Sequence, residues 1–223
     1  MKTVLWYINS SKIFSRLSDK EKTDLSSMLR TTNVKKGSMV YGIGEKAETI
    51  YLLKEGSIKI SRLSGDGKEL TMDVLKSGDI FGETALSEEG KREDIAEAIE
   101  DSAVCDVKKQ DFETLIRNNP IFSFSMIKFI GLRLKKIENR FEDVIFKDVR
   151  TRVIALLKDV ANRYGTPAHD GKALEVKLSH QDIANLVGAT RETVTLALDG
   201  LKKEGLIADI KRKKIIITKK LLP

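Results

Sequence analysis

Two stretches of the sequence carry residue types that could bind negatively charged groups. The first, residues 82–94, reads GETALSEEGKRED. A glycine, a glutamate and small residues at its start are typical of a turn whose backbone N–H groups face an anion. Glu93 and Asp94 at its end would repel that anion. The segment therefore predicts either an anion cradle or a turn that keeps the shape without the ligand.

The second stretch, residues 179–201, has the signals of two short helices joined by a tight turn. Ser179 and Asp182 have the spacing of a capping box, and Gly188 gives the backbone freedom that a tight turn needs. Thr190 is placed to cap the second helix. The apolar residues recur at helical spacing on one face: Ile183, Leu186, Val187, Val194, Leu198 and Leu201. The pattern predicts helix, turn, helix.

The second of these helices begins with exposed residues that can read base pairs. Arg191, Glu192 and Thr195 should point away from its apolar face. Arginine can donate two hydrogen bonds to guanine O6 and N7, and glutamate can accept one from cytosine N4. The alternative is a plain helical hairpin with a solvated Arg–Glu pair. The basic segment at residues 211–214 and the charge distribution favour DNA binding.

The positive charge of the chain is confined to its last third. The net charge is +7, and residues 147–223 hold 16 Lys and Arg against 9 Asp and Glu, whereas residues 1–146 hold 24 of each. A basic module joined to a neutral one indicates a polyanionic partner for the basic part. The alternative is a Lys-rich surface that is merely solvated.

Composition excludes several classes of protein. The chain of 223 residues has one cysteine, so it has no internal disulfide, and it has no apolar run of membrane-spanning length and no secretion signal at its start. It has no Ser/His/Asp arrangement, metal-ligand cluster, Walker loop or Rossmann fingerprint. We expect a cytoplasmic protein that is not an enzyme and holds no metal.

The elements that position these stretches follow from hydrophobic periodicity. Residues 1–30 read as helical, with Ser18 as an N-cap and Glu21 three residues later. Residues 33–109 alternate short β-rich runs with glycines, which predicts a compact β sandwich or barrel. Residues 148–164 form a further helix, and residues 165–179 a loop with one short strand. The last residues, ADIKRKKIIIT, read as two short strands around a basic turn.

A long helix is expected from about residue 120 to 146. Its apolar residues are spaced alternately three and four apart, which is the heptad repeat of a coiled-coil seam. We favour a seam between two parallel copies of the helix over a helix lying on its own β domain, because a strict 3.5-residue period makes a narrow face. The predicted dimer interface consists of Ile127, Ile130, Leu134, Ile137, Phe141 and Val144.

These segments resemble the CRP/FNR family of bacterial transcription regulators. LSHQDIANLVGATRETVTLALDGLKKEGLI is similar to its winged helix-turn-helix, and KKGSMVYGIGEKAETIYLLKEGSIKI with DGKELTMDVLKSGDIFGETAL to its cyclic-nucleotide-binding β-roll. The resemblance implies an α+β fold with a β-roll at 1–118, a dimerisation helix at 119–147 and a winged helix-turn-helix at 148–223. It also implies a homodimer that binds near-palindromic double-stranded DNA and contacts RNA polymerase.

The resemblance assigns roles within the C-terminal module. Arg191 and Glu192 match the family's base-reading pair. Ser179, His180 and Gln181 match positions that meet DNA phosphates, where His180 replaces a residue that is often Arg, so that its contact is expected to be weaker or to depend on pH. Leu196 stands where the family commonly has a further Arg, which removes one base contact. Phosphate contacts are also expected from Thr190 and from the wing residues Lys211, Arg212, Lys213 and Lys214.

The resemblance also identifies residues 82–94 as a phosphate cassette that departs from the cyclic-AMP-binding pattern. Gly82 and Glu83 match it, but the Arg and the small hydroxyl residue are replaced by Glu93 and Asp94. A shift of register would be needed to bring Arg92 inward. The Thr–Ser pair that holds adenine is replaced by Ile137 and Glu138. The candidate effector pocket is thus Gly82, Glu83, Thr84, Arg92, Glu93, Asp94, Ile137 and Glu138.

Two departures argue against cyclic AMP, and we expect no cofactor. The open alternatives are activity without a ligand, another effector in the β-roll, a cyclic nucleotide bound by a non-standard cassette, or redox and gas sensing through haem. Haem has weak support because both histidines, His169 and His180, lie in the C-terminal module. Cys105 alternates with valines in a strand, which favours a packed residue over a sensor.

Overall fold

The computed structural model describes residues 3–11, 13–14, 16–87, 90–174, 176, 178–210 and 214–222. The chain divides into two compact units, one of Met1–Lys68 with Met72–Lys136 and the other of Glu69–Thr71 with Ile137–Pro223. Mixed helix and strand content with a β domain, a long helix and a helix-turn-helix agrees with the α+β fold expected from the sequence. None of the described helices is both long and apolar enough to cross a membrane.

The first unit begins with two helices rather than one continuous helical region. They are α1 (Val4–Ser10) and α2 (Asp19–Met28). The expected N-cap of α2 is confirmed, since the Ser18 hydroxyl accepts from the Glu21 N–H while the Glu21 carboxylate accepts from the Ser18 N–H. This reciprocal cap satisfies two N–H groups that have no partner within the helix, so it fixes where α2 begins.

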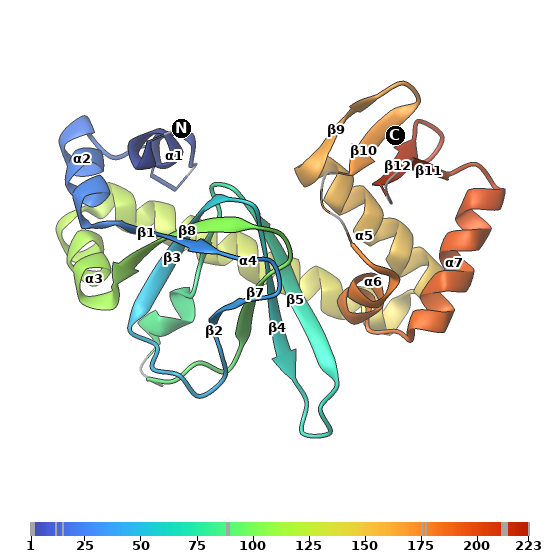
Figure 1. Ribbon diagram of the computed structural model, residues 1–223, viewed down its shortest axis with the longest axis horizontal. Helices are drawn as coiled ribbons and strands as arrows, with labels where there is room; N and C mark the ends of the chain where they lie inside the picture. Colours follow the sequence, from blue (N-terminus) through green and yellow to red (C-terminus); the bar gives the residue numbers. More distant parts are fainter. Residues whose placement is uncertain are drawn as a thin grey trace. The chain divides into compact units, whose positions relative to one another are not determined.

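Eight strands follow and form two antiparallel four-stranded sheets (Figure 1). The strands are β1 (Arg30–Val34), β2 (Met39–Tyr41), β3 (Thr49–Glu55), β4 (Ser57–Leu63), β5 (Glu69–Lys76), β6 (Ile80–Phe81), β7 (Ile95–Ala98) and β8 (Ser102–Lys108). The sheet orders are β1-β8-β3-β6 and β2-β7-β4-β5. Side chains from both sheets, among them Leu53, Ile58, Phe81 and Val104, share one buried core. Of the sandwich or barrel expected from the glycine-punctuated strands, the structure has the sandwich.

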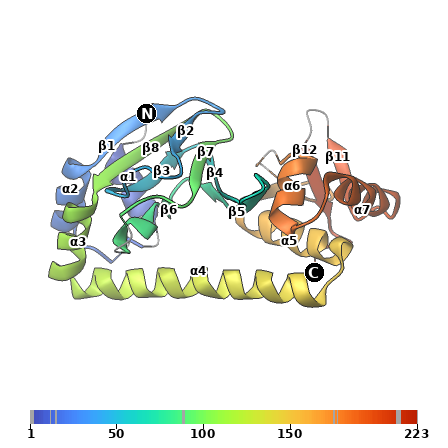
Figure 2. The same cartoon turned by 90° about the horizontal axis from the view of Figure 1, so that it is seen from below.

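The other face of the first sheet is covered by helices. A second core joins Ile50, Leu52 and Cys105 of the strands to residues of α1, α2, α3 (Lys109–Asn118) and α4 (Pro120–Phe146). The bounds of α4 confirm the expected long helix, which Figure 2 shows as one continuous rod. Phe122 and Met126 anchor its first turns in this core, so α4 uses one side to pack on its own β domain.

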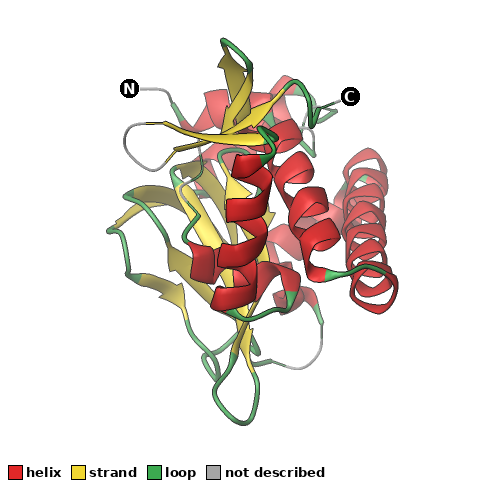
Figure 3. Ribbon diagram, turned by 90° about the vertical axis from the view of Figure 1, so that its right-hand side faces the viewer, coloured by secondary structure: helices red, strands yellow, loops and turns green. Residues whose placement is uncertain are grey.

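The second unit combines three helices with a small sheet. Helix α5 (Val149–Tyr164) is capped by Asp148, and α6 (His180–Val187) and α7 (Arg191–Lys203) follow it. Strands β9 (Gly165–Ala168), β10 (Gly171–Leu174), β11 (Ile207–Ile210) and β12 (Lys214–Thr218) pair in the order β11-β12-β10-β9. Figure 3 colours all helices of the chain red and all strands yellow.

The structure differs from the expected elements at residues 165–179. The sequence predicted a loop with one short strand, whereas β9 and β10 form a hairpin that joins the wing strands in one sheet. The hairpin was missed because Gly165–Ala168 lacks alternating apolar residues. The segment is a strand because it pairs with β10, where Gly165 lies opposite Leu174.

Candidate functional site

The start of α6 is fixed by the capping box expected from the sequence. The Ser179 hydroxyl accepts from the Asp182 N–H, and the Asp182 carboxylate accepts from the Ser179 N–H at 2.8 Å. Ile183, Ala184, Leu186 and Val187 are buried, so only one face of α6 is available to a partner. Gly188 then ends the helix in the left-handed conformation (φ +63°, ψ +52°), which glycine adopts without strain. This turn reverses the chain so that α7 can pack against α6.

Helix α7 presents its first turn to solvent. Thr190 caps it, with its hydroxyl accepting from the Thr193 N–H, while Val194, Leu198 and Leu201 bury the opposite face. Arg191 and Glu192 are exposed, as is Gln181 at the start of α6. The structure therefore brings the predicted base-reading pair and predicted phosphate contacts onto exposed first turns of two adjoining helices. Leu196 is also exposed, at 74% of its surface, on the same helix.

Thr195 connects the two helices through a short chain of hydrogen bonds. Its Oγ1 lies 2.9 Å from His180 Nδ1 on α6 and 2.9 Å from the Arg191 carbonyl oxygen one turn back on α7. Both side chains are half-buried. The sequence predicted separate roles for Thr195 and His180 but gave no signal that they touch.

The predicted wing contacts are placed only in part. Lys211, Arg212 and Lys213 lie outside the described residues, and Lys214 begins β12. Strands β11 and β12 flank this segment and pair antiparallel, with Ile210 opposite Lys214. Strands β11 and β12 are thus the two strands expected on either side of this basic segment.

In the first unit, Gly82 and Glu83 open the cassette as a tight turn. Gly82 has φ +74° and precedes the 3-10 helix η1 (Glu83–Leu86). A Cβ at Gly82 would lie 3.1 Å from the Arg92 guanidinium and 3.1 Å from the Tyr51 ring. Both the backbone angle and this close packing favour glycine here, so Gly82 serves the fold as the sequence suggested.

Arg92 turns inward, contrary to the expected register. Its side chain is buried, with Nη1 donating to the Gly82 carbonyl at 2.9 Å and Nη2 donating to the Thr49 carbonyl. Its guanidinium also lies 4.2 Å from the centre of the Tyr41 ring. Nε is the guanidinium nitrogen that has no hydrogen-bond partner among the described residues.

The prediction that Glu93 faces the cassette interior is wrong. Its side chain is 56% exposed and forms an ion pair with Arg62 at 2.7 Å. Successive side chains of an extended segment point to opposite sides, so an inward Arg92 sends Glu93 outward. Asp94 does point inward, where it is half-buried and accepts from the Tyr41 hydroxyl at 3.2 Å. Burial and the Asp94 charge raise the pKa of Tyr41, so its hydroxyl stays a donor.

Two cations of α4 reach the β domain, and sequence reasoning missed both. Arg133 forms an ion pair with Glu83 at 2.6 Å, and Lys136 with Asp73 at 2.7 Å. Ile137 and Glu138, which the sequence placed in the pocket, are exposed instead. Arg133 and Lys136 lie one helical turn apart and so share one face of α4. This spacing was the sequence signal that a polar stripe of the helix faces Glu83 and Asp73.

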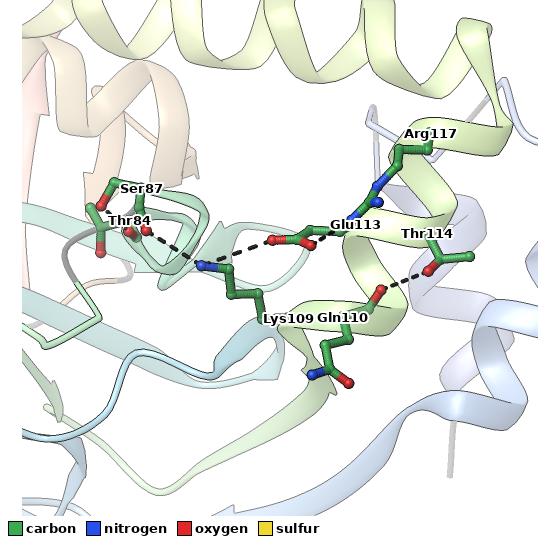
Figure 4. A network of polar contacts seen from close by, with 7 residues as sticks. All are labelled: Thr84, Ser87, Lys109, Gln110, Glu113, Thr114 and Arg117. Atoms are coloured by element: carbon green, nitrogen blue, oxygen red, sulfur yellow. Dashed lines mark hydrogen bonds and ion pairs between the residues drawn. The ribbon is translucent and has the colours of Figure 1, made fainter.

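Thr84 lies in a polar network on the outer side of η1 (Figure 4). The Thr84 side chain is exposed, and its carbonyl accepts from the Ser87 hydroxyl at 2.7 Å. Lys109 of α3 donates to the Ser87 carbonyl and pairs with Glu113, which also pairs with Arg117. The network ties η1 to α3 and places Thr84 at the surface.

Cys105 is a packed residue, as the strand pattern indicated. It is fully buried in the core beneath the helices, and burial raises the pKa of its thiol. A protonated, inaccessible thiol is a poor nucleophile. No group of three or more His, Cys, Asp or Glu that could hold a metal occurs among the residues that the structure describes.

The seam residues of α4 are exposed in the single chain. Their exposed fractions lie between 45% and 68%, for Ile127, Ile130, Leu134, Ile137, Phe141 and Val144. A continuous apolar stripe of this kind is unusual on a protein that acts as a monomer. The first residues of α4 that pack on the β domain, Phe122 and Met126, are different ones.

Three features together define a class of DNA-binding transcription regulators. They are a β-roll with a phosphate-cassette turn, a long helix, and a helix-turn-helix with an exposed recognition turn. Residues 31–119 match the family model described as "Cyclic nucleotide-binding domain", and residues 151–220 match the "Crp-like helix-turn-helix domain". The chain belongs to the CRP/FNR family of transcription regulators.

Relatives of known name agree with this placement. The chain is 31% identical to the anaerobic regulatory protein of Bacillus subtilis over 208 residues, covering 91% of this chain and 87% of the relative. It is 32% identical to the CRP-like cAMP-activated global transcriptional regulator of Mycobacterium tuberculosis over 185 residues, covering 82% of each. The fold resembles that of FixK2 from Bradyrhizobium japonicum, with a TM-score of 0.76, 24% identity and coverage of 85% and 92%.

Proposed function

We propose that this regulator acts in the cytoplasm as a homodimer on near-palindromic promoter sites, where it contacts RNA polymerase and has no enzymatic activity. The observation that carries the proposal is the exposed first turn of α7, with Arg191 and Glu192, on a helix that contacts the N-terminus of α6 through Thr195 and His180. Such a helix enters the major groove while the preceding helix meets the backbone.

The apolar stripe of α4 supports the dimer. Two copies of the helix can bury their exposed Ile, Leu, Phe and Val side chains against each other, because the 3.5-residue period keeps the stripe on one face of a supercoil. A two-fold dimer would carry two recognition helices, which suits half-sites about one helical turn, ~34 Å, apart.

We further propose that cyclic AMP does not control this protein. Both terminal nitrogens of the Arg92 guanidinium donate to backbone carbonyls, so the chain itself fixes the guanidinium and a phosphate could use only the remaining N–H groups. Glu83 is held by Arg133, and Asp94 adds a half-buried carboxylate near Tyr41. A cyclic phosphate would need to displace these contacts and approach the Asp94 charge.

Replacing Arg191 by alanine tests the base-reading role. We expect a loss of about 1–3 kcal/mol of discrimination at one guanine of each half-site, because a bidentate contact is removed. Mobility shifts on operators that vary at single positions measure it. Lys203→Ala, at the exposed far end of the same helix, is the control and should change affinity little and equally for all sequences. Equal effects of both substitutions on every operator would contradict the assignment.

Calorimetry with cyclic AMP and cyclic GMP tests the absence of cyclic-nucleotide control. We expect no binding tighter than ~10 µM, about −7 kcal/mol, because the cassette cation is already hydrogen-bonded to the chain. A tighter constant, together with a change in operator affinity, would favour the alternative of a cyclic-nucleotide-responsive regulator. The remaining alternative, redox or gas sensing through haem, is tested by absorption spectra recorded while haem is titrated into the protein.

A further inference from the structure

The pairing of His180 with Thr195 determines which nitrogen of the imidazole ring carries its proton. A threonine hydroxyl has one hydrogen to donate. The Thr195 hydrogen is directed to the Arg191 carbonyl at 2.9 Å, which has no hydrogen of its own to offer. Thr195 Oγ1 therefore accepts from His180, and the proton of the neutral ring resides on Nδ1.

The other ring nitrogen, Nε2, has no partner among the described residues and carries a lone pair when the ring is neutral. A lone pair cannot donate to a phosphate oxygen, which is itself an acceptor. A second proton on Nε2 converts the ring into a cation with a free donor, and such a cation forms a charge-assisted hydrogen bond with phosphate. The neutral and protonated forms of His180 thus differ in what they can offer DNA.

We propose that His180 donates a hydrogen bond to a DNA phosphate only when its ring is protonated, a dependence that we call the gate. Thr195 is the positioning residue, because its hydroxyl fixes which ring nitrogen carries the proton of the neutral form. This inference rests on the proposed DNA-binding function. Thr195 then has a role other than donating to a base, because its hydroxyl donates to the Arg191 carbonyl. Operator affinity then rises as pH falls, because binding takes up protons.

The charged groups of α6 and α7 near the ring are either held by other residues or exposed. On α6, the Asp182 carboxylate is held by Ser179. On α7, the charged side chains near Thr195 in sequence are Arg191 and Glu192, both exposed, and Asp199 one turn further on, also exposed. Among the described residues, none of these groups forms an ion pair with His180, so a DNA phosphate is the anion that the protonated ring would meet.

Operator affinity of the full-length protein measured between pH 8 and pH 6 at constant salt tests the proposal. Imidazole changes charge in this range. One gated contact gives a gain of about 3–10-fold per half-site, hence roughly 10–100-fold for a dimer. The slope of log affinity against log salt should also be steeper at pH 6, by about 0.9 for each protonated contact.

Three substitutions of the histidines separate the gate from general effects of pH. His180→Gln should bind at pH 8 as tightly as the native protein or more tightly, because its amide can donate to a phosphate, and it should lose the gain at pH 6. His180→Arg should bind tightly at both pH values because its charge is permanent. His169→Gln is the matched control, because His169 is the other histidine of the chain, is exposed, and lies in the β9–β10 turn. It should keep the native pH profile.

Thr195→Val tests the positioning role. Without the hydroxyl, the neutral ring can move its proton to Nε2 and donate to a phosphate without taking up a second one. We expect binding at pH 8 equal to or tighter than that of the native protein, with a flatter pH profile. Thr195→Ser keeps the hydroxyl and should keep the native profile. An unchanged profile in Thr195→Val would overturn the positioning role.

The possible results distinguish this inference from the proposed function. Sequence-specific binding with a flat pH profile, or a gain that persists in His180→Gln, overturns the gate and leaves the DNA-binding function standing. Absence of specific binding to any promoter fragment at every pH overturns the proposed function and the gate with it. Far-UV circular dichroism of each variant confirms that the helices are retained.

Discussion

Leu134→Asp is expected to convert the protein from a dimer to a monomer and to weaken binding to a two-half-site operator by about 10²–10⁴-fold. Leu134 lies in the middle of the exposed apolar stripe of α4. An aspartate there would place two like charges side by side in a seam that excludes water, which opposes pairing of the helices. Sedimentation velocity reports the oligomeric state, and mobility shifts report the affinity.

The control for this substitution lies on the same helix. Leu132 is 70% exposed, and its position in the heptad repeat puts it on the side of α4 opposite to the seam. Leu132→Asp has the same cost in helix propensity and should leave the dimer intact. Binding to a single half-site should be similar in both variants, because the C-terminal unit is untouched. A Leu134→Asp protein that sediments as a stable dimer would show that α4 is not the interface.

Arg92→Ala is expected to lower the free energy of unfolding by about 3–5 kcal/mol, since it removes a buried cation and leaves two backbone carbonyls without their donor. Arg92 is 2% exposed and joins Gly82 of the cassette turn to Thr49 of β3. Its packing against Tyr41 is lost at the same time. Thermal denaturation followed by circular dichroism measures the change.

Arg62→Ala is the matched control for Arg92→Ala. Arg62 also serves the cassette, but its ion pair with Glu93 is about half exposed, and such pairs contribute roughly 0–1 kcal/mol. Arg92→Lys should also be destabilising, because one ammonium cannot reproduce the fixed fork of a guanidinium between two carbonyls. Equal stability losses in Arg62→Ala and Arg92→Ala would mean that the buried contacts of Arg92 do not hold the turn.

The sequence by itself determined those parts of the protein whose signals are local. The caps at Ser18, Ser179 and Thr190 each involve a partner three residues away, so side-chain type and spacing sufficed to place the helix starts. The long helix α4 followed from a stretch without internal proline and with a heptad period, and the β domain from glycine-separated strands, although the strand pattern did not decide between a sandwich and a barrel. The resemblance to a family added the order of the domains and their class.

Only the tertiary structure decided which side chains of the cassette and of the DNA-facing helices meet. Arg92 bonds to a carbonyl 43 residues away, and a shift of one residue in an extended segment reverses which side chain points inward. The sequence therefore placed Glu93 inside the cassette, whereas packing against Tyr41 and Gly82 placed Arg92 there. His180 and Thr195 are 15 residues apart on two helices, and the angle of the turn at Gly188 brings them together. Backbone carbonyls have no side-chain identity, so no pattern of residue types could have identified them as the partners of Arg92 and Thr195.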